Sequence, residues 1–231
     1  MIPWLSPDNL LFPPVEMALT DPDGLLAAGG DLSSQRLLAA YHRGIFPWYN
    51  PGEPILWWSP DPRTVIFPDQ FQPSQSLRKL LRKNHFRVTF DQQFPAVMQE
   101  CAAATTERPA TWISDDIIAA YSQLHRLGHA HSVEVWQDDQ LAGGLYGIAL
   151  GQVFFGESMF SRVSNASKVA FATLMAQLAQ WQFAMVDCQV VNDHLLSLGA
   201  REIPRSDFQR LLQTHIPQPS LAQQGHWNSA K

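Results

Sequence analysis

Residues 131–160 read HSVEVWQDDQLAGGLYGIALGQVFFGESMF, and the interpretation of the fold starts from this stretch. Its runs of β-branched and aromatic residues, separated by turn signals, predict three strands in a meander. A long helix is predicted next, at 165–182, and then a buried strand, AMVDCQV, at 184–190. This order favours an α/β (α+β) fold with a mixed, largely antiparallel sheet over a doubly wound sheet, which would alternate strand and helix throughout.

The segments before the meander add further strands and helices. Strands are predicted at 64–67 and 86–91, and helices at 74–84, 94–104 and 114–128. The first sixty or so residues are instead dense in Pro, Gly and Trp and close with the turn-rich SPDPR. We therefore expect a small N-terminal domain at 1–62, a main domain at 63–216, and a polar, loosely held C-terminal tail at 217–231.

The composition narrows the class of protein. The 231 residues carry a formal net charge of -5, which argues against a generic nucleic-acid coat, because sequence-independent binding to phosphates needs an excess of Lys and Arg. Any RNA binding must then come from a local patch. The sequence has no run of roughly 18 to 20 apolar residues that could cross a bilayer and no signal-peptide pattern at its start. We expect a cytoplasmic protein that does not bind membranes.

Cysteine and histidine spacing gives no support for a disulfide framework or a metal site. Cys101 and Cys188 are far apart and lack CxxC spacing, so both are predicted to be reduced thiols. His125, His129 and His131 crowd together, yet no carboxylate or thiol completes a metal-like spacing. Neither GxGxxG nor the P-loop pattern occurs. We predict no metal and no cofactor.

The strand at 184–190 contains two polar residues with catalytic potential. Because side chains alternate along a strand, Asp187 and Gln189 are expected to share one face, with Cys188 on the other. Most pairs of this kind only satisfy nearby backbone groups. A second hypothesis makes Cys188 a nucleophile with His194 as its base. We favour it less, because Cys188 is expected to face the apolar layer, where free cysteine behaves as a small hydrophobe.

Two further features precede this strand in the sequence. Glu157 follows Gly156 at the end of an apolar strand, where acidic residues are often simply solvated but can attract a cation beside a cavity. Phe171, Leu174 and Leu178 form one apolar face of the helix that follows, and such a face usually belongs to the core.

The helix at 74–84 concentrates positive charge. Arg78 and Arg82 are four residues apart, as are Lys79 and Lys83, so four cations share one region of the helix surface. A solvated helix face explains this pattern, and so does a patch that contacts phosphates. Like charges at this spacing repel each other, which makes an anionic partner plausible.

Several longer motifs occur together in one order along the chain, from about residue 12 to residue 212. They are GLLAAGGDLS, YHRGIFPWY, WWSPDPR, GHAHSVEVW, GGLYG, FFGESMFSR, NASK, DCQVVNDHLLSLGA and EIPR. With these motifs the chain resembles the bacterial leucyl/phenylalanyl-tRNA–protein transferases. The resemblance implies a small N-terminal domain joined to a GNAT-like acyltransferase domain, in agreement with the boundary placed after residue 62.

The resemblance also implies an activity and its partners. The expected reaction moves Leu or Phe, and less readily Met, from aminoacyl-tRNA to the α-amine of proteins that begin with Arg or Lys. Such a transfer marks the acceptor for degradation by the N-end rule pathway. Replacing an ester with an amide is downhill, so the chemistry requires neither ATP nor a metal. A monomer is expected.

Residue roles carry over motif by motif. Asp187 and Gln189 resemble the polar pair at the reacting amine, and Glu157 resembles a pocket residue near the substrates. Because an ordinary Asp, with a pKa near 3.9, is a poor base, our hypothesis is that Asp187 orients and polarises the amine through Gln189. Trp48 and Trp112 are similar to aromatic residues that hold the 3′-terminal adenosine. The basic helix matches the region that grips the tRNA body. The apolar pocket for the aminoacyl side chain is implied to consist of Leu145, Met159, Phe171, Leu174, Leu178 and Val186.

Three other functions stay open on the residues alone. A GNAT-like enzyme could use coenzyme A, although its loop pattern Q/RxxGxG/A is absent before residue 167, where NASK stands instead. A non-catalytic RNA-binding module would need the basic helix but would tolerate the loss of Asp187. A peptidoglycan-type aminoacyl transferase would share the charged-tRNA donor but use a cell-wall acceptor.

Overall fold

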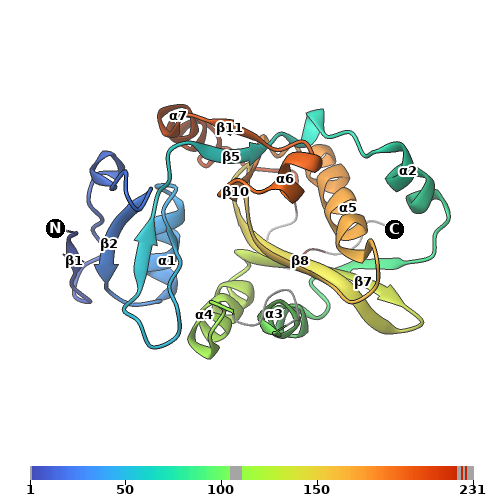
Figure 1. The fold of residues 1–231 in the computed structure, drawn as a ribbon, viewed down its shortest axis with the longest axis horizontal. Helices are drawn as coiled ribbons and strands as arrows, with labels where there is room; N and C mark the ends of the chain where they lie inside the picture. Colours follow the sequence, from blue (N-terminus) through green and yellow to red (C-terminus); the bar gives the residue numbers. More distant parts are fainter. Residues whose placement is uncertain (1, 105–110, 223–224, 226, 228–231) are drawn as a thin grey trace.

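The computed structural model describes residues 2–104, 111–222, 225 and 227, and it contains two β-sheets (Figure 1). The N-terminal sheet has the order β1-β2-β4-β3 and is packed by one helix, α1, which spans Ser34–Tyr41. Its strands are β1 Trp4–Leu5, β2 Leu25–Gly29, β3 Phe46–Pro47 and β4 Leu56–Trp58. A 3-10 turn, η1, spans Val15–Met17. The boundary predicted after residue 62 falls between β4 and the first strand of the larger sheet.

The larger sheet has seven strands in the order β11-β5-β10-β9-β8-β7-β6. They are β5 Arg63–Ile66, β6 Arg87–Phe90, β7 Ala130–Gln137, β8 Gln140–Leu150, β9 Val153–Ser161, β10 Met185–Gln189 and β11 Arg201–Ile203. Within the described residues every neighbouring pair of this sheet is antiparallel except β9 and β10. The predicted meander and the mixed, largely antiparallel sheet are confirmed.

Helices cover both faces of this sheet (Figure 1). They are α2 Gln75–Arg82, α3 Phe94–Ala102, α4 Asp115–Arg126, α5 Ala166–Gln180, α6 Asp193–Ser197 and α7 Arg205–His215, with a 3-10 turn, η2, at Pro68–Gln70. α5 packs on one face, whereas α3 and α4 pack on the other. Ser114 caps α4 by accepting from the Ile117 N–H.

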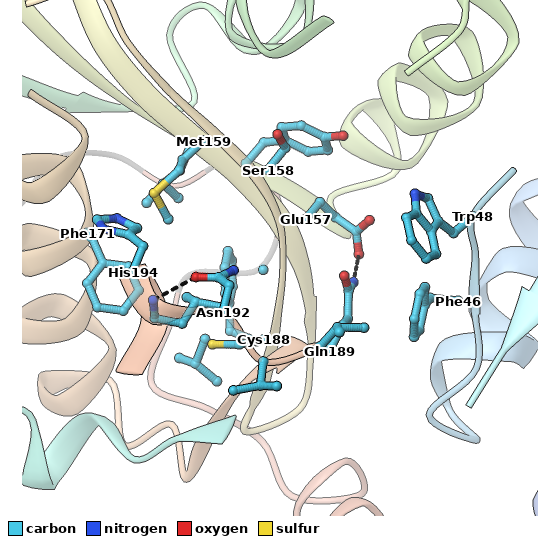
Figure 2. A pocket seen from close by; sticks show the side chains of 18 of the residues that line it. Phe46, Trp48, Glu157, Ser158, Met159, Phe171, Cys188, Gln189, Asn192 and His194 are labelled. Carbon is cyan, nitrogen blue, oxygen red and sulfur yellow. Dashed lines mark hydrogen bonds between the residues drawn. The ribbon is translucent and has the colours of Figure 1, made fainter. Parts of the chain in front are cut away.

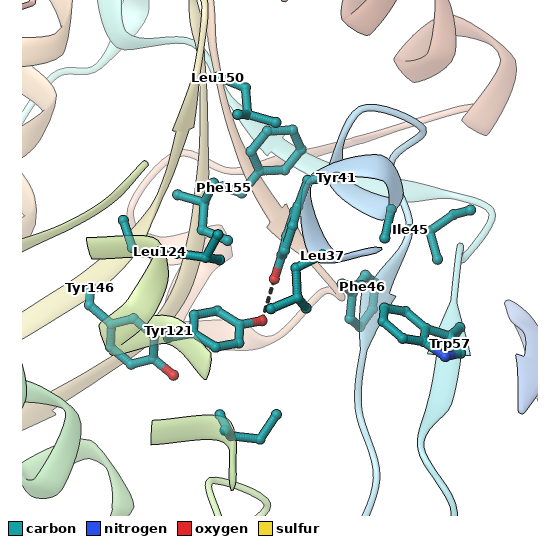
Figure 3. Close-up of a cluster of buried hydrophobic side chains, with 14 of the residues drawn as sticks. Leu37, Tyr41, Ile45, Phe46, Trp57, Tyr121, Leu124, Tyr146, Leu150 and Phe155 are labelled. Atoms are coloured by element: carbon teal, nitrogen blue, oxygen red, sulfur yellow. Dashed lines mark hydrogen bonds between the residues drawn. The ribbon is translucent and has the colours of Figure 1, made fainter. Parts of the chain in front are cut away.

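The N-terminal part shares a hydrophobic core with the α3–α4 face of the large sheet (Figure 3). Leu37 and Tyr41 of α1 and Phe46 of β3 belong to the same buried cluster as Tyr121 of α4 and Phe155 of β9. Tyr41 and Phe155 meet edge to face, with ring centroids 5.2 Å apart. This shared core fixes the aromatic segment around Phe46 beside the large sheet.

The C-terminal tail departs from the prediction at one residue. Trp227 is only 1% exposed, and its ring stacks on His131 with centroids 3.8 Å apart. Its backbone N–H donates to Asp91. The expectation of a loosely held tail is therefore wrong at Trp227, because burial of one large aromatic ring is strongly favourable. None of the described helices is both long and apolar enough to span a bilayer.

Candidate active site

A cavity of about 480 Å³ opens between β9, β10, α5 and α6 of the main domain and β3 of the N-terminal part. In Figure 2, Met159 and Phe171 lie at one end and Phe46 and Trp48 at the other, with a hydrogen bond between Glu157 and Gln189 nearer the aromatic end. We call this cavity the reaction pocket, and its ends the apolar end and the aromatic end.

The apolar end combines side chains from four neighbouring elements. Five of the six predicted pocket residues line it, namely Leu145, Met159, Phe171, Leu174 and Val186. Phe154 of β9 lines it as well, a position that sequence reasoning missed. Gly147 allows this close packing, since a Cβ there would lie 2.2 Å from the Phe155 carbonyl oxygen and 2.5 Å from the Phe154 side chain. The second half of the GGLYG motif thus shapes the pocket.

Leu178 is the exception among the predicted pocket residues. It is fully buried in the cluster between α5 and the sheet and is not among the residues that line the cavity. Leu178 lies one turn beyond Leu174 on the same helix face. At this level of the helix, the face packs against the core and no longer lines the cavity. The prediction that Leu178 lines the pocket is therefore wrong.

The aromatic end contains both predicted tryptophans. Trp48 is 46% exposed, and Trp112 is half-buried; both line the cavity. Trp58 supports Trp48, because its indole Nε1 donates to the Trp48 carbonyl at 2.6 Å and the two rings lie 5.7 Å apart. The rim therefore presents a large apolar ring surface to solvent, the arrangement on which a planar group can stack.

Glu157 is held by donors from three other elements. Its carboxylate accepts from Tyr41 at 2.7 Å, from Tyr121 at 3.3 Å and from Gln189 Nε2 at 3.0 Å, while the two tyrosine hydroxyls lie 2.5 Å apart. Burial raises the pKa of Glu157 to about 7, against the opposing effect of these hydrogen bonds. A carboxyl group with this pKa exchanges its proton near neutral pH.

Both tyrosines remain protonated donors. Burial and the neighbouring Glu157 raise the pKa of Tyr41 and that of Tyr121 well above the ordinary value. Tyr41 belongs to α1 and Tyr121 to α4, so the carboxylate on β9 is fixed by residues from both parts of the molecule.

Asp187 lies behind the reaction pocket and not in it. It is completely buried and is bound in a bidentate ion pair by Arg63, with Nε to Oδ1 at 2.8 Å and Nη2 to Oδ2 at 2.7 Å. The Arg63 guanidinium is in turn enclosed by the rings of Phe46 and Phe208, at 4.9 and 4.6 Å from their centroids. Asp187 is absent from the cavity lining, whereas Gln189 is present.

The expectation that Asp187 and Gln189 share one strand face is therefore wrong. A register shift between these two residues, where β10 pairs with β5, interrupts the alternation, and Gln189 adopts a left-handed conformation with φ of +64°. The Gln189 N–H donates back to Asp187 Oδ1 at 2.9 Å. The carboxylate thus holds the bulge that turns the Gln189 side chain toward Glu157.

Cys188 and His194 both line the reaction pocket, but the environment of the thiol does not suit a nucleophile. Burial and the adjacent Asp187 carboxylate raise the pKa of Cys188 far above its ordinary value. The thiol packs against the apolar cluster under α5, as expected for a small hydrophobic side chain.

Comparisons with known proteins identify the family. The model of the leucyl/phenylalanyl-tRNA protein transferases matches residues 65–213, and the model of their N-terminal domain matches residues 30–61. The chain belongs to the leucyl/phenylalanyl-tRNA protein transferase family. It is therefore an aminoacyltransferase, which sets aside the coenzyme A enzyme and the non-catalytic RNA-binding module.

Relatives cover nearly the whole chain. A leucyl/phenylalanyl-tRNA–protein transferase of Cellvibrio japonicus is 61% identical over 219 residues, which cover 95% of this chain and 93% of that protein. The enzyme of the same name from Pseudomonas fluorescens strain SBW25 is 58% identical over 229 residues, covering 99% and 100%.

Similarity to solved structures is weaker. A GCN5-related N-acetyltransferase from Kribbella flavida covers 73% of this chain and 59% of its own, at 10% identity and a TM-score of 0.39. L-PGS from Bacillus licheniformis covers 73% and 54%, at 9% identity and a TM-score of 0.40. The acetyltransferases are the class named in the sequence-based prediction, but TM-scores this low carry no argument about function.

The basic residues of this transferase lie outside the reaction pocket. Arg78, Lys79, Arg82 and Lys83 are all exposed on α2 or at its end, and α2 packs beside α5 (Figure 1). Within the described part of the chain, no carboxylate pairs with any of the four. Their charge is directed to solvent.

Sequence reasoning missed the residues that support the transferase's polar groups. Tyr41 and Phe46 lie within YHRGIFPWY and Arg63 ends WWSPDPR, so two of the motifs quoted for the family contained them. Tyr121 lies in the apolar pattern of α4, and nothing local distinguishes its buried hydroxyl from an ordinary core position.

Proposed function

We propose that this transferase moves Leu or Phe, and less readily Met, from aminoacyl-tRNA to the N-terminal α-amine of proteins beginning with Arg or Lys. The observation that carries the proposal is the reaction pocket itself, in which an apolar end, an aromatic rim and a carboxylate–amide pair meet. The product is a protein with a new N-terminal Leu or Phe, which acts as an N-end rule degradation signal.

The apolar end selects the donor amino acid. Apolar atoms surround the side chain of the donor amino acid; they come from the five predicted residues that line this end and from Phe154 and Cys188. A charged or polar side chain would therefore lose its hydration without gaining a hydrogen-bond partner. Apolar walls distinguish side chains by only roughly 1 to 3 kcal/mol per methylene. Leu, Phe and Met are therefore all accepted, whereas Ala gains too little contact.

The aromatic end binds the 3′-terminal adenosine of the donor. Its base stacks on Trp48 or Trp112, a contact worth roughly 1 to 3 kcal/mol. This placement puts the ester that joins the ribose to the amino acid between the rim and the apolar end, close to Glu157 and Gln189. The exposed cations of α2 then bind phosphates of the tRNA body.

Glu157 and Gln189 act on the acceptor. The nitrogen of the α-amine bonds to the ester carbonyl carbon, and the bond from that carbon to the ribose 3′ oxygen then breaks. One proton leaves the nitrogen and one reaches the departing oxygen, and Glu157, with its pKa near 7, accepts the first and returns it. Gln189 donates to Glu157 through Nε2, which leaves Oε1 to orient the amine.

Asp187 serves this site as a positioning residue. The Arg63 ion pair and the hydrogen bond to the Gln189 N–H fix the bulge, and through it the amide that faces Glu157. The negative charge of Glu157 at the pocket wall also attracts the cationic Arg or Lys at the start of the acceptor. We also propose a monomeric, cytoplasmic enzyme.

The test is transfer of radiolabelled leucine from leucyl-tRNA to a peptide beginning with Arg. Matched reactions use the same peptide with an acetylated N-terminus, the same peptide beginning with Glu, and alanyl-tRNA as donor. We expect label only in the free Arg peptide and only from leucyl-tRNA. Label in the acetylated peptide would refute attack by the α-amine, and equal transfer of alanine would refute selection by the apolar end.

A Glu157→Gln variant tests the role of the carboxylate in the same assay. We expect a lower kcat and a higher KM for the Arg peptide, because both the proton acceptor and the negative charge are lost. An unchanged KM for the peptide would remove Glu157 from acceptor binding.

A further inference from the structure

A second cavity, of about 360 Å³, adjoins the reaction pocket across α6. Asn192, His194 and Leu195, at the start of α6, line the reaction pocket, whereas the segment from Leu196 to Gly199 lines the second cavity. The other walls come from the end of β5, from η2 and from β11, and they consist of Ile66, Phe67, Gln70, Phe71, Gln72 and Arg201.

The chemistry of this cavity suits a planar polar ligand. The guanidinium of Arg201 lies over the Phe67 ring, 4.3 Å from its centroid, so one face of the cation is covered. Arg201 is nevertheless exposed, and it lines the cavity. Gln70 and Gln72 place two exposed side-chain amides on the same rim. A stacked guanidinium with neighbouring amides binds nucleobases and phosphates.

Position and charge favour RNA over the acceptor protein. One wall of the cavity is α6, which also lines the reaction pocket, and the wall at Gln72 leads directly into α2 with its exposed cations. The cavity therefore adjoins the reaction pocket at α6 and leads along the chain to the cationic helix proposed to bind the tRNA body. Arg201 would repel an acceptor that begins with Arg or Lys, but it attracts a phosphodiester strand.

We propose that this cavity binds a nucleotide of the single-stranded 3′ end of the donor tRNA, upstream of the terminal adenosine. The inference rests on the proposed function, because it assumes that aminoacyl-tRNA is the donor. The base stacks on the free face of Arg201, and the amides of Gln70 and Gln72 bind its polar edge. The affinity of the enzyme for the donor tRNA then comes from the terminal adenosine and also from this upstream nucleotide.

The experiment compares two donors with one Arg peptide: leucyl-tRNA, and the leucyl ester of adenosine, which lacks every upstream nucleotide. Arg201→Gln is expected to raise the KM for leucyl-tRNA about tenfold. The kcat/KM for leucyl-adenosine and the KM for the peptide should stay within about twofold. Phe67→Leu, which removes the supporting ring, should act in the same direction on leucyl-tRNA alone. Arg126→Gln on α4, across the sheet, removes another exposed charge and should leave the kinetics with both donors unchanged.

Three results would overturn the inference. The first is unchanged kinetics of Arg201→Gln with leucyl-tRNA. The second is an equal loss of transfer by this variant with both donors. The third is a loss of transfer that depends on the length of the acceptor peptide and not on which donor is used. If the wild-type enzyme transfers leucine from neither donor, the proposed function itself fails. A wild-type enzyme that is active, beside an Arg201→Gln variant with unchanged kinetics, refutes only this cavity's role.

Discussion

The two ends of the reaction pocket are built from different kinds of interaction. Around the apolar end, side chains from α5 and from β8, β9 and β10 belong to one packed cluster and meet through apolar contact. Beside the aromatic end, Tyr41, Tyr121, Glu157 and Gln189 come from four elements and are joined by hydrogen bonds of 2.5 to 3.3 Å. Behind this network lies a fully buried ion pair.

This difference sets how each end responds to change. Apolar contacts are numerous and individually weak, so a substitution there alters affinity in small steps. In the polar network, removal of one partner leaves a buried group unsatisfied and shifts the properties of the groups that remain. We therefore expect graded changes in selectivity at the apolar end and changes in stability and pH dependence at the other.

The largest effect is expected behind the polar network. Asp187→Asn leaves the Arg63 guanidinium buried without its counter-charge, and breaking such a pair typically costs about 3 to 5 kcal/mol. Urea unfolding at pH 7 should show this loss. Transfer by the folded fraction should also fall, since a neutral amide accepts from the Gln189 N–H more weakly than the carboxylate does.

Replacing both partners separates the two roles of Asp187. The double variant Arg63→Met, Asp187→Leu removes the charges together, so much of the stability should return, while transfer stays slow because the Gln189 N–H has lost its acceptor. Asp187→Asn with wild-type stability but no transfer would instead make Asp187 a direct participant in the reaction.

The next effect concerns Glu157 and pH. Its pKa is about 7 in the folded protein against 4.5 for an ordinary Glu, so between these values the folded state binds more protons than the unfolded state. The free energy of unfolding therefore decreases as pH rises from about 5 to 8, by up to about 3 kcal/mol. Glu157→Gln should lack this decrease. Parallel unfolding curves for the two proteins across this range would contradict the raised pKa.

A smaller effect is expected at the apolar end. Leu174→Val removes roughly one methylene from the pocket wall, which should favour Phe over Leu as donor by about tenfold in kcat/KM. Leu178→Val is the matched control, because the same change one turn along α5 lies in the core. If both variants shift the ratio of kcat/KM for the Phe and Leu donors equally, the α5 wall of the apolar end extends to Leu178, contrary to the structure.

The same contrast explains what could be predicted from the sequence. The apolar end follows from local periodicity, and the helix expected around Phe171 and Leu174 is present. The expectation that the preceding strand ends at Gly156 is wrong, because β9 continues through Glu157 to Ser161 and so holds Glu157 within the sheet. Periodicity could not show where the helix face leaves the cavity, so Leu178 was assigned wrongly. The cavity boundary depends on the depth of packing, which a helical repeat does not encode.

The polar end depends on pairs that are distant in the chain. Arg63 and Asp187 are 124 residues apart, and Tyr41 and Glu157 are 116 apart. Strict alternation predicted a shared face for Asp187 and Gln189, but the bulge in β10 is fixed by the distant Arg63 partner and by a positive φ at Gln189. The motifs quoted for the family contained Tyr41 and Arg63 without indicating what these residues touch.

The smallest effect, about 1 kcal/mol, isolates one bond of the polar network. The Tyr41 hydroxyl donates to Glu157 and lowers the pKa of that carboxyl group, so Tyr41→Phe should raise the pKa further. If ionised Glu157 accepts the proton of the amine, kcat/KM for transfer rises with pH through about 7 in the wild type, and the rise should move upward by up to about one pH unit in the variant. The acceptor amine titrates identically in the wild-type and Tyr41→Phe reactions, so a difference between the two pH profiles comes from a group of the enzyme. The double variant Tyr41→Phe, Glu157→Gln should match Glu157→Gln alone at every pH. A uniform loss in Tyr41→Phe, with the profile unmoved, would make Tyr41 only a packing residue between the two parts of the molecule.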